Sequence, residues 1–209
     1  MLFRSDRLGS AESGIAYLCG RPGAVVPGSS GVVTPMAEIK LVDKDGQEVP
    51  RGQPGVLMMR SDTAGQYYVR DHEKSKMVFP GGDWVNTGDV FRQDEKDNFW
   101  YIGRADEMIK VSGIWVSPLE IESGLHACPG VQECAALGVE DQDGLMSIKA
   151  FVVLRPGECG STEKLRELQQ YCKAKLGPHK CPGEIRLLQE LPKTGQGKID
   201  RRLLREQHL

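Results

Sequence analysis

Three segments of this 209-residue sequence place polar or charged side chains among glycines, where a plain scaffold does not need them. The segment from Trp84 to Asp89 is interpreted as an exposed turn that ends in a carboxylate. The segment from Tyr101 to Gly113 contains an arginine, two acidic residues and a lysine. The segment from Leu191 to Asp200 contains two glycines that flank a single residue immediately before a lysine. These segments are the candidates for chemistry.

Each segment also has a purely structural interpretation. Asp89 can be an ordinary turn aspartate, because Asp and Gly favour turns. Arg104 and Asp106 can form a surface ion pair, which contributes little to stability. Gly113 can be a hairpin glycine and Lys198 a solvated lysine. Lys198 is not a P-loop lysine, because the Gly-x-x-x-x-Gly-Lys-Ser/Thr spacing is absent and an isoleucine follows it.

Charge and composition favour small-molecule partners over nucleic acid or membranes. The 27 Lys and Arg nearly balance the 29 Asp and Glu, so no basic field attracts nucleic acid or anionic lipid. No apolar run approaches the roughly 20 residues needed to span a bilayer, and the N-terminus lacks the apolar core of a signal peptide. We therefore expect a globular protein of the cytoplasm, and a homo-oligomer is left open.

The six cysteines form no Cys-x-x-Cys pair, and their scatter predicts reduced, mostly buried thiols. The nearest approach to a zinc site is the set of Cys172, His179 and Cys181. This set lacks a fourth ligand and a recognisable knuckle spacing, so ordinary packing is the favoured interpretation.

The segments that must position these residues divide into two kinds. From about Met36 to Gly103, short apolar runs broken by Gly, Pro and Asp predict an all-β region. Predicted strands cover residues 37–43, 56–59 and 99–102, with a hairpin-type turn at Asp45-Gly46.

The sequence after Arg104 predicts a compact α+β domain. Residues 108–116 form two β-rich arms around Ser112-Gly113, and Ser117 with Glu120 predicts a capping box for a helix from Pro118 to about Ala127. Strands are expected at 134–139, 148–154 and 184–188. Ser161 and Asp200 open two further helices, the first with an apolar stripe made of Leu165, Leu168, Tyr171, Cys172 and Leu176.

The predicted fold class is thus α+β, with residues 1–104 mostly β and residues 105–209 a small α+β domain of ordinary size. Met1 to Arg7 run directly into Leu8–Glu12 with no helix or strand period of their own. We interpret this start as a truncation point of a larger protein.

Taken together and in this order, the three segments resemble the adenylate-forming superfamily of acyl- and aryl-CoA ligases, luciferases and peptide-synthetase adenylation domains. The resemblance covers the chain from Gly9 to its end. It implies that the chain is the C-terminal part of an ATP-dependent acid–CoA ligase. Nothing in the sequence resembles the family's phosphate-binding loop, which lies in the N-terminal domain, so we expect the chain alone to be inactive.

The resemblance also assigns roles in nucleotide binding. Residues 9–12 resemble the Gly-x-Thr-Glu motif, which implies that Glu12 helps hold Mg²⁺ of MgATP and that Ser10 contacts the nucleotide; alanine stands where the motif has threonine. Residues 87–89 resemble the Thr-Gly-Asp motif, whose aspartate, here Asp89, binds the ribose hydroxyls. Arg104 matches the arginine that reaches the ribose and phosphates.

The resemblance places Asp106 at the hinge position and makes Lys198 the catalytic lysine of a C-terminal loop. The chemistry agrees, because a carboxylate attacking the α-phosphate of ATP brings two anions together. Unit charges about 4 Å apart repel by roughly 4 kcal/mol at an effective dielectric constant near 20. A lysine between them removes that obstacle by charge rather than as a base.

The second half-reaction brings the CoA thiol to the acyl adenylate. The resemblance implies that Ser112 and Gly113 line the pantetheine tunnel, where a residue without a side chain leaves room for the arm. In the family the small domain rotates between the two steps, which exchanges the lysine loop for this hairpin.

Within the superfamily, residues 21–23, 27–31 and 110–118 are similar to benzoate-type CoA ligases, which favours an aromatic acid as substrate. Two alternatives stay open at this stage. One is an adenylation domain that loads a carrier protein, and the other is a nonenzymatic remnant that folds and interacts without turnover.

Overall fold

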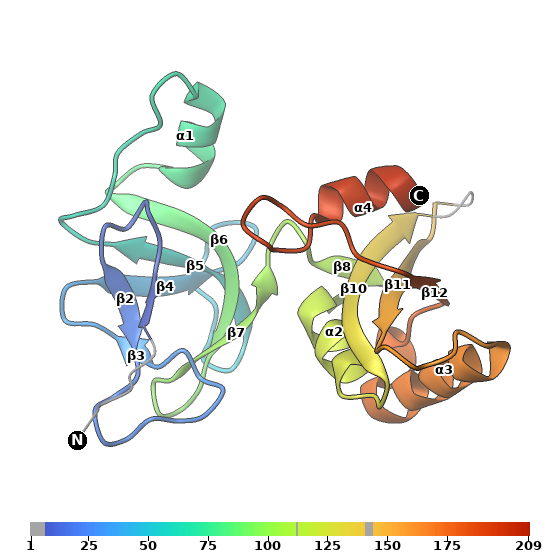
Figure 1. The fold of residues 1–209 in the computed structure, drawn as a ribbon. Coiled ribbons are helices and arrows are strands. Elements are labelled where there is room, and N and C mark those ends of the chain that lie inside the picture. The colour runs from blue at the N-terminus through green and yellow to red at the C-terminus, as the bar shows by residue number, and fades with distance from the viewer. Residues whose placement is uncertain (1–6, 112, 141–143) are drawn as a thin grey trace. The chain divides into compact units, whose positions relative to one another are not determined.

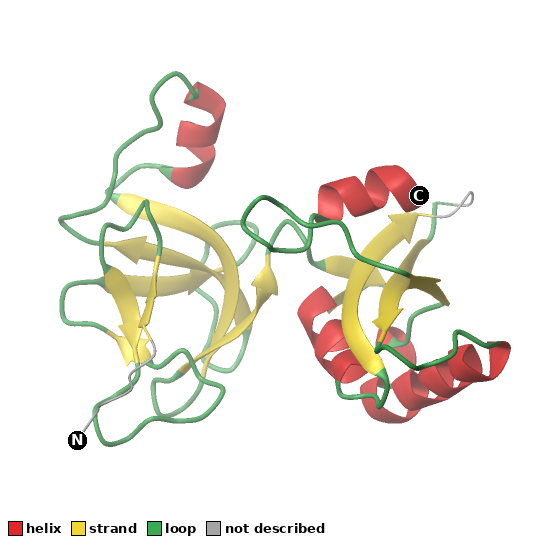
Figure 2. Ribbon diagram, viewed as in Figure 1, coloured by secondary structure: helices red, strands yellow, loops and turns green. Residues whose placement is uncertain are grey.

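The computed structural model describes residues 7–111, 113–140 and 144–209, and divides the chain into two compact units (Figures 1 and 2). The first unit ends at Asp106 and the second begins at Glu107. Ser112, one of the two residues predicted to line the pantetheine path, lies outside the described residues.

The first unit contains two small antiparallel sheets. One is three-stranded and has the order β1 (Arg7–Gly9), β2 (Ala16–Cys19), β3 (Val32–Val33). The other is a four-stranded meander of β4 (Glu38–Val42), β5 (Pro54–Arg60), β6 (Trp84–Gln93) and β7 (Phe99–Arg104). The core between them is formed by buried side chains from both sheets: Tyr17, Leu18, Leu41, Leu57, Met59, Val85, Phe91 and Phe99.

Two predictions for this unit are wrong. Residues 72–78 form a helix, α1 (His72–Val78), inside the region predicted to be all β. Asp71 caps it by accepting a hydrogen bond from the Lys74 amide at 3.1 Å. The helix buries none of its residues, so it carries no apolar stripe by which the sequence could reveal it. Residues 84–89, predicted to be an exposed turn, lie within β6.

The second unit contains a hairpin, a three-stranded sheet and three α-helices. The hairpin comprises β8 (Ile109–Val111) and β9 (Ile114–Val116). The sheet has the order β10 (Val131–Glu140), β11 (Met146–Leu154), β12 (Glu184–Leu188), with β10 antiparallel and β12 parallel to β11. The helices are α2 (Pro118–His126), α3 (Thr162–Leu176) and α4 (Arg201–His208), and a 3-10 turn η1 (Pro178–Lys180) follows α3.

Side-chain alternation gives this sheet two buried faces. Because successive residues of a strand point to opposite faces, Cys134 and Ala136 pack with α2 and α3, whereas Ala135 and Leu137 pack with Leu204 of α4. Figure 1 shows α2 and α3 on one side of β10 and β11, and α4 on the other. The sheet is therefore the middle layer of an α+β unit, as predicted.

The hydrogen bonds at the first residues of α2, α3 and α4 can be compared with the predicted helix caps. Ser161 accepts a hydrogen bond from the Lys164 amide at 3.2 Å, and Asp200 accepts one from the Leu203 amide at 3.0 Å, which confirms both caps. Ser117 occupies the N-cap of α2, but its side chain makes no cap hydrogen bond, so the predicted capping box does not form. All six cysteines are free thiols, three of them buried.

Candidate functional site

A β-bulge in β6 presents Asp89. Strands β5 and β6 pair Val56 with Val90 and Met58 with Asn86, so three residues of β6 oppose one residue of β5. Gly88, at the centre of the bulge, has φ +69°, a conformation that side chains disfavour. The bulge therefore turns the Asp89 carboxylate out of the regular strand alternation, which explains why the segment resembles a turn in sequence.

Side-chain hydrogen bonds hold the bulge in place. The Thr87 hydroxyl donates to the Leu57 carbonyl at 2.9 Å and accepts from the Asp89 amide at 3.1 Å. The Gly88 amide donates to the Asn86 side chain at 2.9 Å. The polar residues of this segment thus replace the ladder hydrogen bonds that the bulge interrupts.

Arg104 lies directly opposite Asp89 in the pairing of β6 and β7. Its Nη1 donates to the Thr87 carbonyl at 2.8 Å and to Asp89 Oδ1 at 3.2 Å, and its Nε donates to Asp106 Oδ1 at 3.2 Å. The guanidinium covers Gly88 so closely that a Cβ built there would lie 2.7 Å from Nη2. The ion pair of Arg104 and Asp106 predicted as the structural interpretation does form, and Asp89 joins it.

Burial and charge act against each other on Asp89, whose side chain is 20% exposed. Burial raises the pKa of the Asp89 carboxyl, while the Arg104 charge and hydrogen bond lower it. Arg104 engages Asp89 Oδ1, and the carboxylate has a second acceptor oxygen, so it can accept hydrogen bonds from a ligand such as a ribose diol.

Glu12 is fixed by the segment that leads into α1. The Tyr68 hydroxyl donates a short hydrogen bond to Glu12 Oε1, and the Gly65 amide donates to the Glu12 carbonyl at 2.8 Å. The Tyr68 hydrogen bond is the largest cause of a lowered Glu12 pKa. Ser10 and Ser13 exchange hydrogen bonds through their hydroxyls, which closes the turn that carries Glu12.

Tyr17 is a buried residue that the charges of Asp89 and Glu12 affect, and no sequence signal pointed to it. Its ring is fully buried in the core, and its hydroxyl has no hydrogen-bond partner among the described residues. Burial raises the pKa of the Tyr17 phenol, and the charges of Asp89 and Glu12 raise it further. The two carboxylates predicted for nucleotide binding therefore act on one buried hydroxyl.

The lysine loop, residues 193–200, is a closed turn in the second unit. The Thr194 amide donates to the Lys198 carbonyl at 2.7 Å, and the Asp200 amide donates to the Pro192 carbonyl at 2.8 Å. Gly197 has φ +79° and open space around it, as the Gly-x-Gly-Lys sequence predicts. Lys198 is exposed, so its ammonium group is available to a ligand.

Gly113 is the described residue at the turn of the β8–β9 hairpin. It has φ +84°, and apart from the glycine and its two chain neighbours no atom of the described residues lies within 4 Å of the position where its Cβ would be. Trp115, on the same hairpin, is 59% exposed, and Lys110 lies over its ring at 5.7 Å. The hairpin therefore presents a bare backbone beside an exposed aromatic ring.

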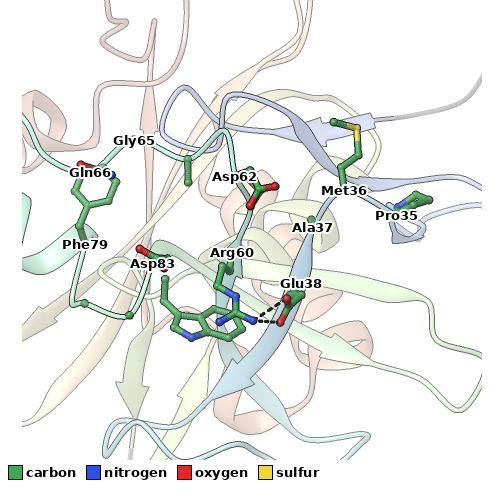
Figure 3. Close-up of a pocket in the computed structure, with 15 residues that line it drawn as sticks. Pro35, Met36, Ala37, Glu38, Arg60, Asp62, Gly65, Gln66, Phe79 and Asp83 are labelled. Atoms are coloured by element: carbon green, nitrogen blue, oxygen red, sulfur yellow. Dashed lines mark hydrogen bonds and ion pairs between the residues drawn. The ribbon is translucent and has the colours of Figure 1, made fainter.

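A pocket of the first unit is lined by none of the predicted site residues. It has a volume of about 810 Å³ and lies along the ends of β4 and β5 (Figure 3). Glu38 and Arg60 form an ion pair on its wall at 2.6 Å, and Arg60 lies over the Trp84 ring at 5.3 Å. The predicted groups lie instead on the bulge, two loops and a hairpin.

The described residues include no group of three or more His, Cys, Asp or Glu side chains that could hold a metal ion. A single carboxylate such as Glu12 still suits Mg²⁺, which commonly binds one or two carboxylates together with substrate phosphates. Across the described part of the chain, no helix has the length and apolar character needed to cross a bilayer.

The first unit carries a bulged aspartate held by an arginine, and the second carries a glycine-flanked lysine loop, which are the features that the resemblance to adenylate-forming enzymes predicts. Residues 120–198 match the family model of the AMP-binding enzyme C-terminal domain. The chain is 41% identical to the benzoate–CoA ligase of Thauera aromatica over 202 residues, which are 96% of this chain and 38% of that protein.

Solved structures agree with this match. The anthranilate CoA ligase AuaEII, in complex with anthranoyl-AMP, superposes with a TM-score of 0.87 at 42% identity, over 97% of this chain and 39% of that one. A benzoate CoA ligase from Burkholderia xenovorans LB400 superposes with a TM-score of 0.83 at 38% identity, over 96% of this chain and 40% of that one. The domain at residues 120–198 belongs to the AMP-binding, adenylate-forming enzymes, and the whole chain spans about two fifths of the length of these relatives.

Proposed function

We propose that this chain provides the ribose-binding aspartate, the catalytic lysine and the CoA hairpin of an aryl-CoA ligase. The reaction joins an aromatic carboxylic acid to CoA through an acyl adenylate, with ATP converted to AMP and pyrophosphate. The single observation that carries the proposal is the Asp89 bulge, because its carboxylate is turned out of the strand and held against Arg104 at 3.2 Å. Similarity to benzoate and anthranilate ligases supports an aromatic acid.

In the first step, Asp89 accepts hydrogen bonds from the ribose hydroxyls and so fixes the nucleotide. Arg104 orients Asp89 from one side and presents positive charge to the phosphates. Lys198 places its ammonium group between the attacking carboxylate and the α-phosphate. It lowers the barrier by charge, and the proton stays on its nitrogen throughout.

Glu12 fits the role of a carboxylate that holds Mg²⁺ of MgATP. Its lowered pKa keeps it ionised at neutral pH, and Tyr68 engages only one of its oxygens by hydrogen bond. When bound there, Mg²⁺ supplies charge neutralisation of the triphosphate. The task of this chain is to keep the Glu12 oxygen in one orientation through Tyr68.

In the second step, the hairpin around Gly113 lines the path of the pantetheine thiol. The exposed Trp115 ring and the absence of a Cβ at Gly113 suit a thin, uncharged arm. Replacing the lysine loop by the hairpin at the site of reaction requires a hinge between the two units. We assign it to Asp106, the last residue of the first compact unit.

A chimeric ligase tests the proposal. Residues 7–209 replace the aligned C-terminal part of the Thauera aromatica benzoate–CoA ligase, and benzoate-dependent ATP–pyrophosphate exchange is measured. We expect exchange in the chimera and a loss of orders of magnitude in Lys198→Ala, since each 1.36 kcal/mol of lost transition-state stabilisation is about a factor of ten. Thioester formation from supplied benzoyl-AMP should be spared.

The control is Lys175→Ala, which removes an exposed lysine from α3 of the same unit. It should leave both half-reactions unchanged. If Lys198→Ala slows the two half-reactions equally, Lys198 is not the residue of the first step and that assignment is withdrawn.

A further inference from the structure

The lysine loop is attached to the second unit at both of its ends. At its start, Lys193 Nζ contacts Glu133 Oε1 of β10 at 2.6 Å, and Lys193 forms a β-bridge with Ile199. At its end the chain enters α4, whose first residue is Arg201. The loop between these points is exposed from Thr194 to Lys198, so its conformation depends on how its ends are held.

Arg201 is paired with a nearly buried carboxylate. Its Nη2 lies 2.7 Å and 2.8 Å from the two oxygens of Glu122, whose side chain is 12% exposed. The same Glu122 carboxylate accepts a hydrogen bond from the Ala136 amide of β10 at 2.8 Å. One carboxylate therefore connects α2, the central sheet and the first residue after the lysine loop.

The position of Arg201 is unfavourable for the helix that it begins. A positive charge in the first helical turn opposes the helix dipole, because the partial charge at that end is also positive. Helix stability alone thus disfavours arginine there. The Glu122 carboxylate compensates this cost, and the pair is buried enough that removing one partner leaves an uncompensated charge.

We propose that the pair of Glu122 and Arg201 positions the lysine loop, and that both are positioning residues for Lys198. The inference rests on the proposed role of Lys198 in adenylation. Arg201 is three residues from Lys198, and three extended residues reach about 10 Å, so a displaced Arg201 changes where the lysine chain begins. The Glu107 carboxylate, 3.7 Å from Arg201 Nε, adds a second negative group to this anchor.

The neighbouring arginine offers a matched control. Arg202 has the same charge, lies in the same helical turn, and is 88% exposed, with an ion pair to Glu206 at 3.0 Å. Arg201→Met and Arg202→Met therefore remove equal charge from the same helix end. They differ in contact with Glu122.

The first measurement is amide hydrogen exchange on the 209-residue chain. In Arg201→Met we expect the hydrogen-bonded loop amides of Thr194, Gly197 and Asp200 to exchange about tenfold faster, with the β10–β11 amides changed less than about twofold. Glu122→Gln, which keeps the shape and removes the charge, should give the same pattern. Arg202→Met should change neither set, and Arg201→Lys should restore part of the protection.

The second measurement compares the rates of the two half-reactions in the chimera with the Thauera aromatica ligase. Arg201→Met should lower kcat for pyrophosphate exchange by about tenfold to 100-fold with KM for ATP little changed, because the lysine is misplaced and the nucleotide site is intact. Thioester formation from supplied benzoyl-AMP should be spared.

The outcomes separate this inference from the proposed function. Loss of loop and sheet protection together, or equal effects of Arg201→Met and Arg202→Met, overturns the positioning role. If Lys198→Ala lowers the rate of pyrophosphate exchange but Arg201→Met does not, the positioning inference fails and the proposed function of Lys198 stands. If Lys198→Ala has no effect on the rate of pyrophosphate exchange, the proposed function of the lysine loop is wrong, and the positioning inference that rests on it is wrong as well.

Discussion

At the scale of single residues, Gly88 and Arg104 explain why the Thr-Gly-Asp segment needs its glycine. Gly88 combines φ +69° with a guanidinium that already occupies the space of a Cβ. The same guanidinium donates hydrogen bonds to the Thr87 carbonyl and to Asp89. A side chain at position 88 therefore competes with Arg104, which holds the aspartate that we propose binds the ribose.

We expect Gly88→Ala to destabilise the first unit and to displace Arg104. The backbone conformation alone costs about 1–2 kcal/mol for a residue with a Cβ. The contact at 2.7 Å with Nη2 adds to that cost. The matched control is Gly46→Ala, with φ +77° and open space around it, which carries only the backbone cost. Urea unfolding of both variants measures the difference, and equal losses would exclude a steric role for Arg104.

Sequence motifs identified Asp89, Arg104, Glu12 and Lys198 one at a time, whereas their partners became visible only in three dimensions. Tyr68 follows Glu12 by 56 positions, and Glu122 precedes Arg201 by 79. No local period or spacing relates residues so far apart. Tyr17 is an aromatic core residue in sequence terms, and only its position near two carboxylates distinguishes it.

At the scale of elements, local signals predicted the starts of α2, α3 and α4 and most strands, but missed α1 and the bulged strand β6. The turn between β6 and β7 is held by side-chain hydrogen bonds. Asp94 accepts hydrogen bonds from the amides of Lys96 and Asn98 at 2.9 Å, and from the Trp100 indole at 2.9 Å. The Trp100 hydrogen bond is the largest cause of an Asp94 pKa of about 2.

This turn predicts a pH-dependent contribution to stability. A carboxyl whose pKa is depressed on folding stabilises the native state above its unfolded pKa, and loses that effect as pH falls through the folded value. Asp94→Asn should therefore lower Tm at pH 7, with a difference that shrinks between about pH 4 and about pH 2. Glu95→Gln, at an exposed position of the same turn, is the control. A Tm difference that is constant with pH would contradict the ionic origin.

The hairpin of β8 and β9 makes a separate prediction about the second half-reaction. In the chimeric ligase, Gly113→Leu should leave pyrophosphate exchange near normal and block CoA transfer, because the new side chain occupies open space that we assign to the thiol. The control for backbone strain is Gly157→Leu, since Gly157 also has a positive φ, +93°, and open surroundings. Loss of both half-reactions in Gly113→Leu would indicate a folding defect and not a blocked path.

At the scale of the whole molecule, the buried side chains divide as the two compact units do. The core of the first unit draws its buried residues from Tyr17 to Phe99, and the two cores of the second from Ile109 to Leu204. No buried core cluster among the described residues contains members from both sides of Asp106. Apolar periodicity predicted a division near this point because each unit completes its own core.

Because the two units have separate cores, we expect residues 107–209 to unfold cooperatively as an isolated fragment. The same unfolding transition should be observed within the 209-residue chain. Leu168 is fully buried between α3 and the sheet, and Leu57 is fully buried in the first unit. Replacing a buried leucine by alanine costs about 2–5 kcal/mol. Leu168→Ala should therefore lower the midpoint of the 107–209 transition in both proteins, whereas Leu57→Ala should leave that transition in place. Differential scanning calorimetry of the two unsubstituted proteins and the three variants measures this, and a shift of the 107–209 transition by Leu57→Ala would mean that the two units unfold as one.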